Sequence, residues 1–412
     1  MTELTIALVG ALDTKGAEYG YLREMIERLG AKVIMIDVGV LGEPAVTADL
    51  DRARIADLGG GDLDRLRGAG DRGAAMQVMA LGAGRAVSQM ITADRLDAVL
   101  TVGGSNAGYV MGEVATHVPI GFPKLLVSTI AAGDTRPYVR ATDVTLTYPV
   151  VDINGLNRIT RPILANAAHA CVGMAGARND RAATASLGSD RMLVAVTMFG
   201  VTTAAGTATV NGLAEHQLEG LTFHCTGVGG SSMETLIRAG LIAGVADLTT
   251  TELADDLVGG VCTAGPDRLT AAGRAGIPQV VSVGALDMIN FGAPETVPAR
   301  FADRNLLAHN PAVTLMRTDP DEATELGRRL AAKLNDATGP VTVLFPHGGL
   351  SQLSVPGGPF ADPVADRALY GALRAGLRSG IELHDFDTDI NDPAIATTAV
   401  ELLAGWLEKE NT

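Results

Sequence analysis

The sequence predicts an α/β protein made of two doubly wound lobes, and three observations support this fold class. The chain has 412 residues, which is more than one ordinary hydrophobic core accommodates. Short apolar runs typical of buried strands alternate with stretches of helical periodicity in both halves. The chain has 50 glycines, and their excess over the usual content is not repetitive but falls in short clusters after apolar runs, where a backbone must turn sharply.

The first half opens as a βαβ unit. Residues 4–9 (LTIALV) form a short apolar run with β-branched members, which predicts a buried strand. From Ala17 onward apolar residues recur with helical spacing, and Gly30 is a typical helix end. Residues 32–38 predict a second strand. A helical connection between two such strands is typical of a parallel crossover.

The same alternation continues through the first half, and residues 178–190 interrupt it. We expect a helix over 72–93, strands over 97–102 and 123–128, and a helix over 155–177. Strands that alternate with helices predict a parallel sheet covered on both faces. The segment 178–190 (RNDRAATASLGSD) is polar and rich in small residues, so we predict that it connects two domains.

The second half repeats the pattern of the first. Strands are expected over 191–198, 220–225, 279–283, 312–316 and 341–345, and helices near 231–240, 319–335, 364–378 and 393–409. We therefore expect two Rossmann-like lobes, residues 1–180 and 190–412, with mostly parallel sheets and a ligand cleft between them.

Composition argues against several classes of partner. The formal net charge of −15 repels polyanions, so nucleic acids and acidic membranes are poor partners. The amino terminus lacks a secretion signal, and no apolar run reaches about 18 residues. Cys171, Cys225 and Cys262 show no metal-ligand spacing, which is typical of a reducing compartment. We expect a cytoplasmic protein whose partner is a small molecule.

The first candidate ligand site is the glycine-rich segment 10–16 (GALDTKG), which follows the first predicted strand. Open parallel sheets bind ligands beyond the carboxyl ends of their strands. Gly10 allows a tight turn, Asp13 and Thr14 could cap the next helix, and Lys15 could balance a phosphate. A capped turn with an exposed lysine would have the same sequence, so both interpretations stay open.

Two further glycine clusters follow predicted strands. In the segment 103–108 (GGSNAG) backbone N–H groups could face an anion, and the side chains of Ser105 and Asn106 add polar groups. The segment 227–234 (GVGGSSME) follows His224 and approaches the dinucleotide-binding pattern. It has Ser232 where the third glycine belongs. Its glutamate, Glu234, could simply complement the helix dipole. Short turns use the same residue types, so each cluster alone is a weak signal.

Candidate proton-transfer residues are scattered along the chain. His347 stands next to two glycines after a predicted strand, where it could serve in acid–base chemistry or be a solvated turn residue. Carboxylates at loop starts could hold a divalent cation, but most such groups are merely solvated, and we assign no metal ligands. The residues that could transfer protons to an organic substrate are His224, Glu234, Asp287 and His347.

An ordered series of short motifs carries a family resemblance over nearly the whole chain. The motifs are GALDTKGAE (10–18), IDVGV (36–40), GGSNAG (103–108), PKLLVST (123–129), VVDINGLNRI (150–159), MFGVTT (198–203), HCTGVGGSSME (224–234), DLTTTELAD (247–255), GPDRL (265–269), GALDMINFG (284–292), HNP (309–311), LMR (315–317) and INDP (390–393). This ordered series resembles the family typified by the ATP-binding amino-terminal domain of the tomato mosaic virus resistance protein.

The resemblance implies two Rossmann-like subdomains, ATP binding with magnesium, and a homodimer. We expect the nucleotide in the first lobe. Three departures from the family pattern occur in the second lobe: Ser231 stands where an arginine is usual, Gly348 where a basic residue is usual, and Asp389 where many members have histidine. The residues that match the family's motifs are Gly10, Asp13, Thr14, Lys15, Gly103, Gly104, Ser105, Asn106, Ser128, Thr129, Gly227, Gly229, Gly230 and Glu234.

Three hypotheses of function follow. The first is a cytoplasmic nucleotide-binding protein, with ATP and magnesium, that acts in small-molecule metabolism as an enzyme or a ligand-gated module. The second is a hydrolase or lyase that holds a small organic-acid or acyl substrate between the lobes without a nucleotide. The third is a non-catalytic dimer that a ligand stabilises.

Overall fold

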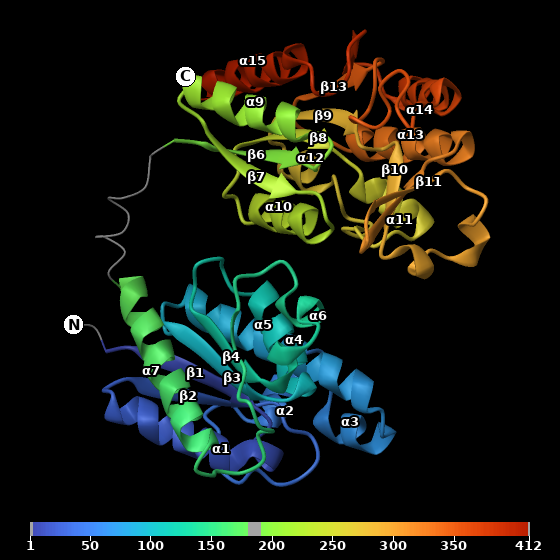
Figure 1. Cartoon of the computed structure of the whole chain (residues 1–412). Coiled ribbons are helices and arrows are strands. Elements are labelled where there is room, and N and C mark those ends of the chain that lie inside the picture. The colour runs from blue at the N-terminus through green and yellow to red at the C-terminus, as the bar shows by residue number, and fades with distance from the viewer. Residues whose placement is uncertain (1–2, 180–190, 411–412) are drawn as a thin grey trace. The chain divides into compact units, whose positions relative to one another are not determined.

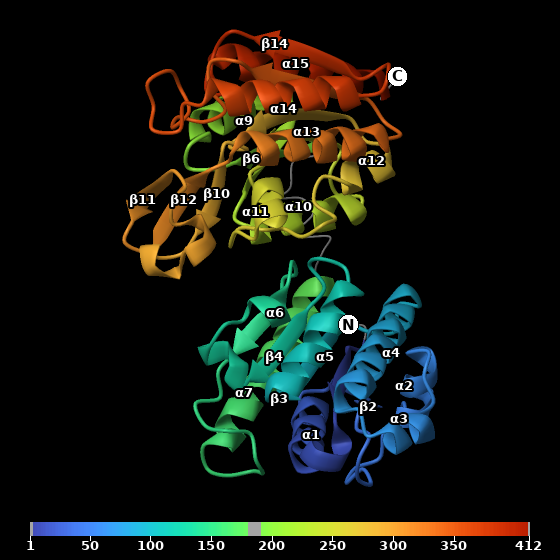
Figure 2. The same cartoon turned by 90° about the vertical axis from the view of Figure 1, so that its right-hand side faces the viewer.

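The computed structural model describes residues 3–179 and 191–410 (Figure 1). The chain forms two compact units, residues 1–189 and 190–412. The predicted connecting segment, 178–190, lies almost wholly outside the described residues. Both units are α/β structures with helices on both faces of a parallel sheet, which confirms the predicted fold class (Figures 1 and 2). None of the described helices is long and apolar enough to cross a membrane.

The N-terminal unit contains a five-stranded parallel sheet with the order β2-β1-β3-β4-β5. Alternate side chains of each strand enter different cores, because successive residues of a strand point to opposite faces. One core packs against α1 and α7, and the other against α2, α4 and α5. The strands are β1 (Thr5–Gly10), β2 (Lys32–Asp37), β3 (Ala98–Gly103), β4 (Lys124–Ser128) and β5 (Thr145–Thr147). The helices are α1 (Leu12–Arg28), α2 (Arg52–Leu58), α3 (Leu63–Ala69), α4 (Arg72–Thr92), α5 (Ser105–Thr116), α6 (Arg136–Val139) and α7 (Thr160–Asn179), with a 3-10 turn at Thr129–Ala132.

This strand order has a topological switch point between β1 and β3. From β1 the chain continues into α1 on one face of the sheet, whereas from β3 it continues into α5 on the other. The two connections therefore diverge, and the carboxyl ends of β1 and β3 are where an open α/β sheet binds its ligand. The turns that begin at Gly10 and Gly103 both stand at this point.

The C-terminal unit contains a six-stranded parallel sheet with the order β14-β13-β9-β8-β6-β7. Helices α9 and α15 pack on one face, and α10 to α14 pack on the other. The strands are β6 (Leu193–Met198), β7 (Glu219–His224), β8 (Gly244–Thr249), β9 (Gln279–Gly284), β13 (Val341–Pro346) and β14 (Glu382–Phe386). The helices are α9 (Thr203–Glu215), α10 (Val228–Arg238), α11 (Glu252–Val258), α12 (Ala271–Ala275), α13 (Pro320–Asn335), α14 (Pro363–Gly376) and α15 (Pro393–Glu410), with 3-10 turns at Pro294–Thr296 and Ala299–Phe301.

A small antiparallel sheet interrupts the βα alternation of the C-terminal unit. Its strands β10 (Met288–Phe291), β11 (Leu306–Asn310) and β12 (Val313–Arg317) have the order β10-β12-β11. The strand predicted at 312–316 therefore exists as β12, but it is antiparallel to both neighbours. Only short turns separate β11 from β12, and such connections join antiparallel strands, because parallel pairing needs a longer crossover.

Asp255 anchors this small sheet to helix α11. Its carboxylate accepts hydrogen bonds from Asn290 Nδ2 at 2.7 Å, from the Asn290 N–H at 3.1 Å and from the Cys262 N–H at 3.1 Å. These hydrogen bonds favour the charged form of the carboxyl, but burial disfavours it more strongly. Burial therefore raises the pKa of Asp255 to about 7. The native state therefore holds one proton that an unfolded aspartate releases near pH 4.

This proton links stability to pH. A raised folded-state pKa contributes stability that is complete below about pH 4 and is lost as the pH rises to about 7. We expect the free energy of unfolding of the wild type, minus that of the Asp255→Asn variant, to fall across this interval and then level off. Urea denaturation at several pH values measures both quantities. A difference that stays constant or rises over the interval would contradict the assignment.

Candidate functional site

In the N-terminal unit, packing explains the glycine at the end of β1. A Cβ atom at Gly10 would lie 2.0 Å from the ring of Tyr19, so only glycine fits beside that side chain. The Tyr19 hydroxyl donates to the carbonyl of Val9 at 2.6 Å and accepts from the N–H of Val102 at 2.9 Å. This tyrosine thus ties β1 to β3 directly beneath the switch point, and Gly10 makes room for it.

Two aspartates shape the same edge by binding backbone groups. Asp13 accepts from the N–H groups of Leu41 and Gly42 at 3.0 and 3.1 Å. Asp37, at the end of β2, accepts from the N–H groups of Leu12 at 3.1 Å and Gly39 at 2.8 Å. Burial raises the pKa of the Asp37 carboxyl. Both carboxylates therefore hold the loop after β2 against the start of α1.

Lys15 brings a positive charge to this edge without a carboxylate partner. Its ammonium donates to the carbonyl oxygen of Ile153, and within the described part of the chain no carboxylate lies within ion-pair distance of it. Thr14, beside it, is exposed. The ammonium of Lys15 is therefore held by a neutral carbonyl group and by no carboxylate of the described residues.

The second predicted turn, after β3, is open. Helix α5 begins at Ser105 without any side-chain cap, and the side chains of Ser105 and Asn106 are exposed. A Cβ atom at Gly104 would meet only Thr129 Oγ1, at 3.9 Å. Ser128 supports the turn from behind, since its hydroxyl donates to the Gly104 carbonyl at 3.2 Å. The first N–H groups of α5 thus face free space, and such groups bind anions.

The third predicted turn, in the C-terminal unit, is filled by a side chain of the protein itself. The N–H groups of Gly227 and Gly230 donate to Glu252 Oε1 at 2.7 and 3.0 Å. A Cβ atom at Gly230 would lie 2.0 Å from Glu252 Oε2, and one at Gly229 would lie 1.8 Å from the His224 carbonyl. These glycines therefore allow a carboxylate and the backbone to approach closely. The carboxylate occupies the donors that a phosphate would need.

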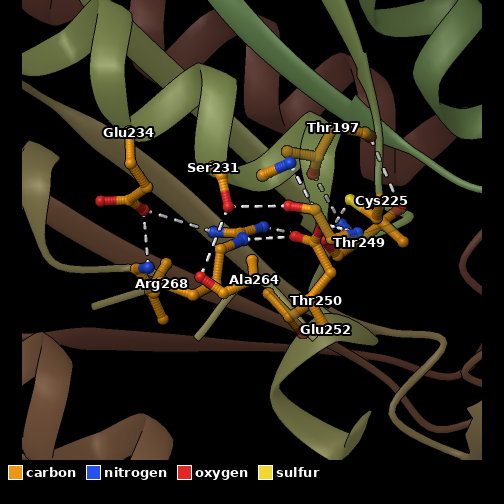
Figure 3. A network of polar contacts seen from close by, with 12 residues as sticks. Thr197, Cys225, Ser231, Glu234, Thr249, Thr250, Glu252, Ala264 and Arg268 are labelled. Atoms are coloured by element: carbon orange, nitrogen blue, oxygen red, sulfur yellow. Dashed lines mark hydrogen bonds and ion pairs between the residues drawn. The ribbon is translucent and has the colours of Figure 1, made fainter. Parts of the chain in front are cut away.

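Arg268 connects this carboxylate to a buried ionic network (Figure 3). The guanidinium is fully buried; its Nε lies 2.6 Å from Glu252 and its Nη1 lies 2.5 Å from Asp247. Glu234 lies 3.7 Å from Nη1, and its oxygens accept from the N–H of Leu269, two residues before α12, at 2.6 Å and from the N–H of Ala271, the first residue of α12, at 2.8 Å. Glu234 is thus a cap for α12.

Hydroxyl and thiol groups complete the network at the ends of β6 and β8 (Figure 3). Thr197 Oγ1 donates to Asp247 at 2.9 Å, and Cys225 Sγ donates to the Thr249 carbonyl at 3.1 Å. The sequence alone assigns no role to Asp247, Glu252 or Arg268. The feature of the sequence that could have indicated this network is Arg268 itself, which follows the acidic segment 247–255 after a short interval.

The four candidate proton-transfer residues occupy separate places. His224 is exposed and packs on Phe199, with ring centroids 5.3 Å apart. Asp287 is buried and accepts from Ser351 Oγ at 2.6 Å, and burial raises its pKa. His347 Nε2 lies 2.9 Å from Asp385 Oδ1. His224 and His347 end strands that are four positions apart in the sheet, about 19 Å, so they cannot serve one reacting atom. A catalytic role for any of the four stays a prediction.

Two surface hollows of about 430 and 620 Å³ lie at the amino edge of the N-terminal sheet. The first surrounds Lys124, which is fully buried, and burial lowers its pKa. Its ammonium already binds two carbonyl oxygens and pairs with Asp143 at 2.6 Å, so it has no donor to offer a ligand.

Across 3–179 and 191–410, no group of three or more His, Cys, Asp or Glu side chains is arranged for a metal ion. We therefore place the candidate site at the carboxyl edge of β1 and β3.

The buried network makes a direct prediction about stability. Both carboxylate oxygens of Glu252 accept hydrogen bonds, so a glutamine there would turn an amide donor toward either the backbone N–H groups or Arg268, and breaking a buried ion pair costs about 3–5 kcal/mol. We expect Glu252→Gln to lower the free energy of unfolding of the C-terminal unit by this order, measured by urea denaturation. The exposed Glu215→Gln is the matched control and should change little. Equal stability of the two variants would show that the network does not hold this unit together.

Comparisons with known proteins cover both halves of the chain. The family models described as "Uncharacterised protein family (UPF0261)" match with the N-terminal domain over residues 4–180 and the C-terminal domain over 191–407. A UPF0261 protein of Clostridium tetani is 40% identical over 98% of this chain and 99% of its own length. One of Rhizobium meliloti is 41% identical over 96% of this chain and 97% of its own length.

A plant protein is also similar. The ToMV resistance protein Tm-1 of Solanum lycopersicum is 39% identical over 80% of this chain, which corresponds to 44% of the tomato protein. The bacterial relatives match from end to end, and the two domain models account for both structural units. The chain therefore belongs to the UPF0261 protein family.

Proposed function

We propose that this protein binds a nucleotide, ATP with magnesium, at the carboxyl edge of β1 and β3 in its N-terminal unit. One observation carries the proposal. The glycine-rich turns at Gly104 and Gly227 each lead from a strand into a helix, and the protein's own carboxylate fills one of these two. The turn at Gly227 receives Glu252, whereas the turn at Gly104 receives no acidic side chain from the described residues.

The filled turn indicates what the open turn requires. In both, the first N–H groups of a helix project beyond the end of a parallel strand, and the helix dipole adds positive potential there. In the C-terminal unit a negative charge satisfies these donors. In the N-terminal unit α5 has 12 residues and an uncapped start, so an external anion is the matching ligand.

Lys15 supports a phosphate as this anion. It extends from the turn after β1, the neighbour of β3, and its positive charge has no carboxylate partner among the described residues. An ammonium beside backbone donors is a common arrangement for phosphate binding. The resemblance to an ATP-binding family favours ATP among phosphate compounds. Magnesium is usually held by phosphate oxygens, waters and one or two carboxylates, and it would reach this site on the nucleotide.

The experiment uses the free space at Gly104. A Cβ atom at this residue would meet only Thr129 Oγ1, at 3.9 Å, and the backbone φ is negative, −87°, so we expect both Gly104→Ala and Gly104→Asp to fold. We expect Gly104→Ala to bind ATP and magnesium nearly as the wild type does. Gly104→Asp introduces a carboxylate where the phosphate should lie, and we expect it to weaken binding at least about 100-fold. Titration calorimetry measures both.

Two outcomes would contradict the proposal. A wild-type protein that shows no binding heat and no thermal stabilisation with ATP and magnesium would exclude the ligand. Undiminished binding by Gly104→Asp would exclude this turn as the phosphate site.

A further inference from the structure

We propose that residues 148–155 form a strap that binds the aromatic base of the nucleotide, with Tyr148 and Val150 as its contact surface. This inference rests on the nucleotide site proposed above. It concerns the base of the nucleotide, which the phosphate site does not bind, and it assigns the binding of the base to residues outside the glycine-rich turns.

The strap runs along the carboxyl edge of the N-terminal sheet. It begins where β5 ends, at Thr147, on the outer edge of the sheet. Its far end is fixed to α1 in two places: the Ile153 carbonyl accepts from Lys15 Nζ, and the Gly155 N–H donates to Glu18 Oε1 at 2.7 Å. The strap therefore joins the last strand of the sheet to the residue that supplies the positive charge of the phosphate site.

Exposed apolar side chains of the N-terminal unit gather at this edge. The large apolar residues exposed in the described part of the unit are Leu41 (72%), Tyr148 (46%), Val150 (66%) and Ile159 (43%). Leu41 follows β2, Tyr148 and Val150 follow β5, and Ile159 precedes α7, so all four lie at carboxyl-edge loops. Leu41 and Tyr148 follow the two outer strands of the sheet and so lie at opposite ends of this edge, whereas Tyr148 and Val150 stand together in the strap.

The backbone of the strap is strained at the same place. Val150 has φ +66°, a conformation that β-branched residues rarely adopt because the side chain crowds the backbone. The Tyr148 hydroxyl donates to the Val150 carbonyl at 3.3 Å, which ties the ring to the strained residue. Strain of this kind persists where the surrounding structure holds a functional conformation. Here it leaves both side chains exposed at the end of β5.

The spacing of the strands suits a nucleotide laid along the edge. In the strand order β1-β3-β4-β5, Lys15 follows β1, Gly104 follows the adjacent strand β3, and Tyr148 follows β5. Three strand spacings are about 14 Å, the scale of a nucleoside triphosphate from phosphate to base. Thr129 follows β4, between the two ends. The phosphates would then lie at β1 and β3, and the base on the ring of Tyr148.

The test compares ATP with inorganic tripolyphosphate, which has phosphates but no base. Stacking of a base on an aromatic ring contributes about 1–3 kcal/mol, so removing the ring should weaken ATP binding at least about fivefold. We expect Tyr148→Ala to show this loss for ATP and none for tripolyphosphate. The conservative Tyr148→Phe should bind both as the wild type does. Titration calorimetry in the full-length protein with magnesium measures all three.

The outcomes separate this inference from the one on which it rests. If the wild type binds neither compound, the nucleotide site itself is wrong. If the wild type binds both and Tyr148→Ala keeps its full affinity for ATP, or loses both compounds equally, the strap does not bind the base. Should Tyr148→Ala fail to fold, Val150→Gly removes the other apolar side chain at a conformation that glycine adopts freely, and it must weaken ATP selectively.

Discussion

The carboxylate of Glu252 receives two backbone N–H groups on one oxygen and the Arg268 guanidinium on the other, in a place that water does not reach. Three buried acidic residues surround one arginine there, and such an excess of negative charge is costly in a protein interior. The helix starts at α10 and α12 offset it, because their N–H groups bind Glu252 and Glu234. In the C-terminal unit the protein's own carboxylates thus bind the N–H groups at these helix starts. The same network fixes strands β6 and β8 to helices α10 and α12.

The N-terminal unit also has helix starts whose N–H groups need acceptors, and no acidic side chain of the described residues binds those at the start of α5. Helix starts at the carboxyl edge of a parallel sheet always present unpaired donors. At α1, backbone and carboxylate groups around Asp13 and Asp37 organise the edge, whereas α5 starts at an open turn. The uncapped start of α5 and the ammonium of Lys15, which has no carboxylate partner among the described residues, are the physical basis for the ligand that we propose in this unit. The two units therefore share a fold class, and under our proposal they differ in the source of the anion, which is Glu252 in the C-terminal unit and the nucleotide in the N-terminal unit.

Sequence patterns predicted the elements whose burial follows from their own residues. Apolar runs such as 97–102 and 341–345 are central strands in the structure, because parallel strands are buried on both faces. Strand β8 escaped prediction because Asp247 interrupts its apolar run, and only Arg268, distant in sequence, allows that charge to be buried. Strand β14 is an edge strand, and it has no apolar run because Glu382, His384 and Asp385 make up most of its five residues. The glycines at 227–230 resembled a phosphate loop, and no local pattern could reveal that Glu252 fills it, since that contact depends on the tertiary fold.

The amide groups of the two glycine-rich turns offer the most direct test of this difference between the units. Two-dimensional NMR of the 15N-labelled protein, titrated with ATP and magnesium, reports on each N–H separately. The account predicts that the resonances of Gly104, Ser105 and Asn106 shift on binding, while those of Gly227 and Gly230 stay in place because Glu252 already occupies them. Shifts at Gly227 and Gly230, with none at the start of α5, would contradict it.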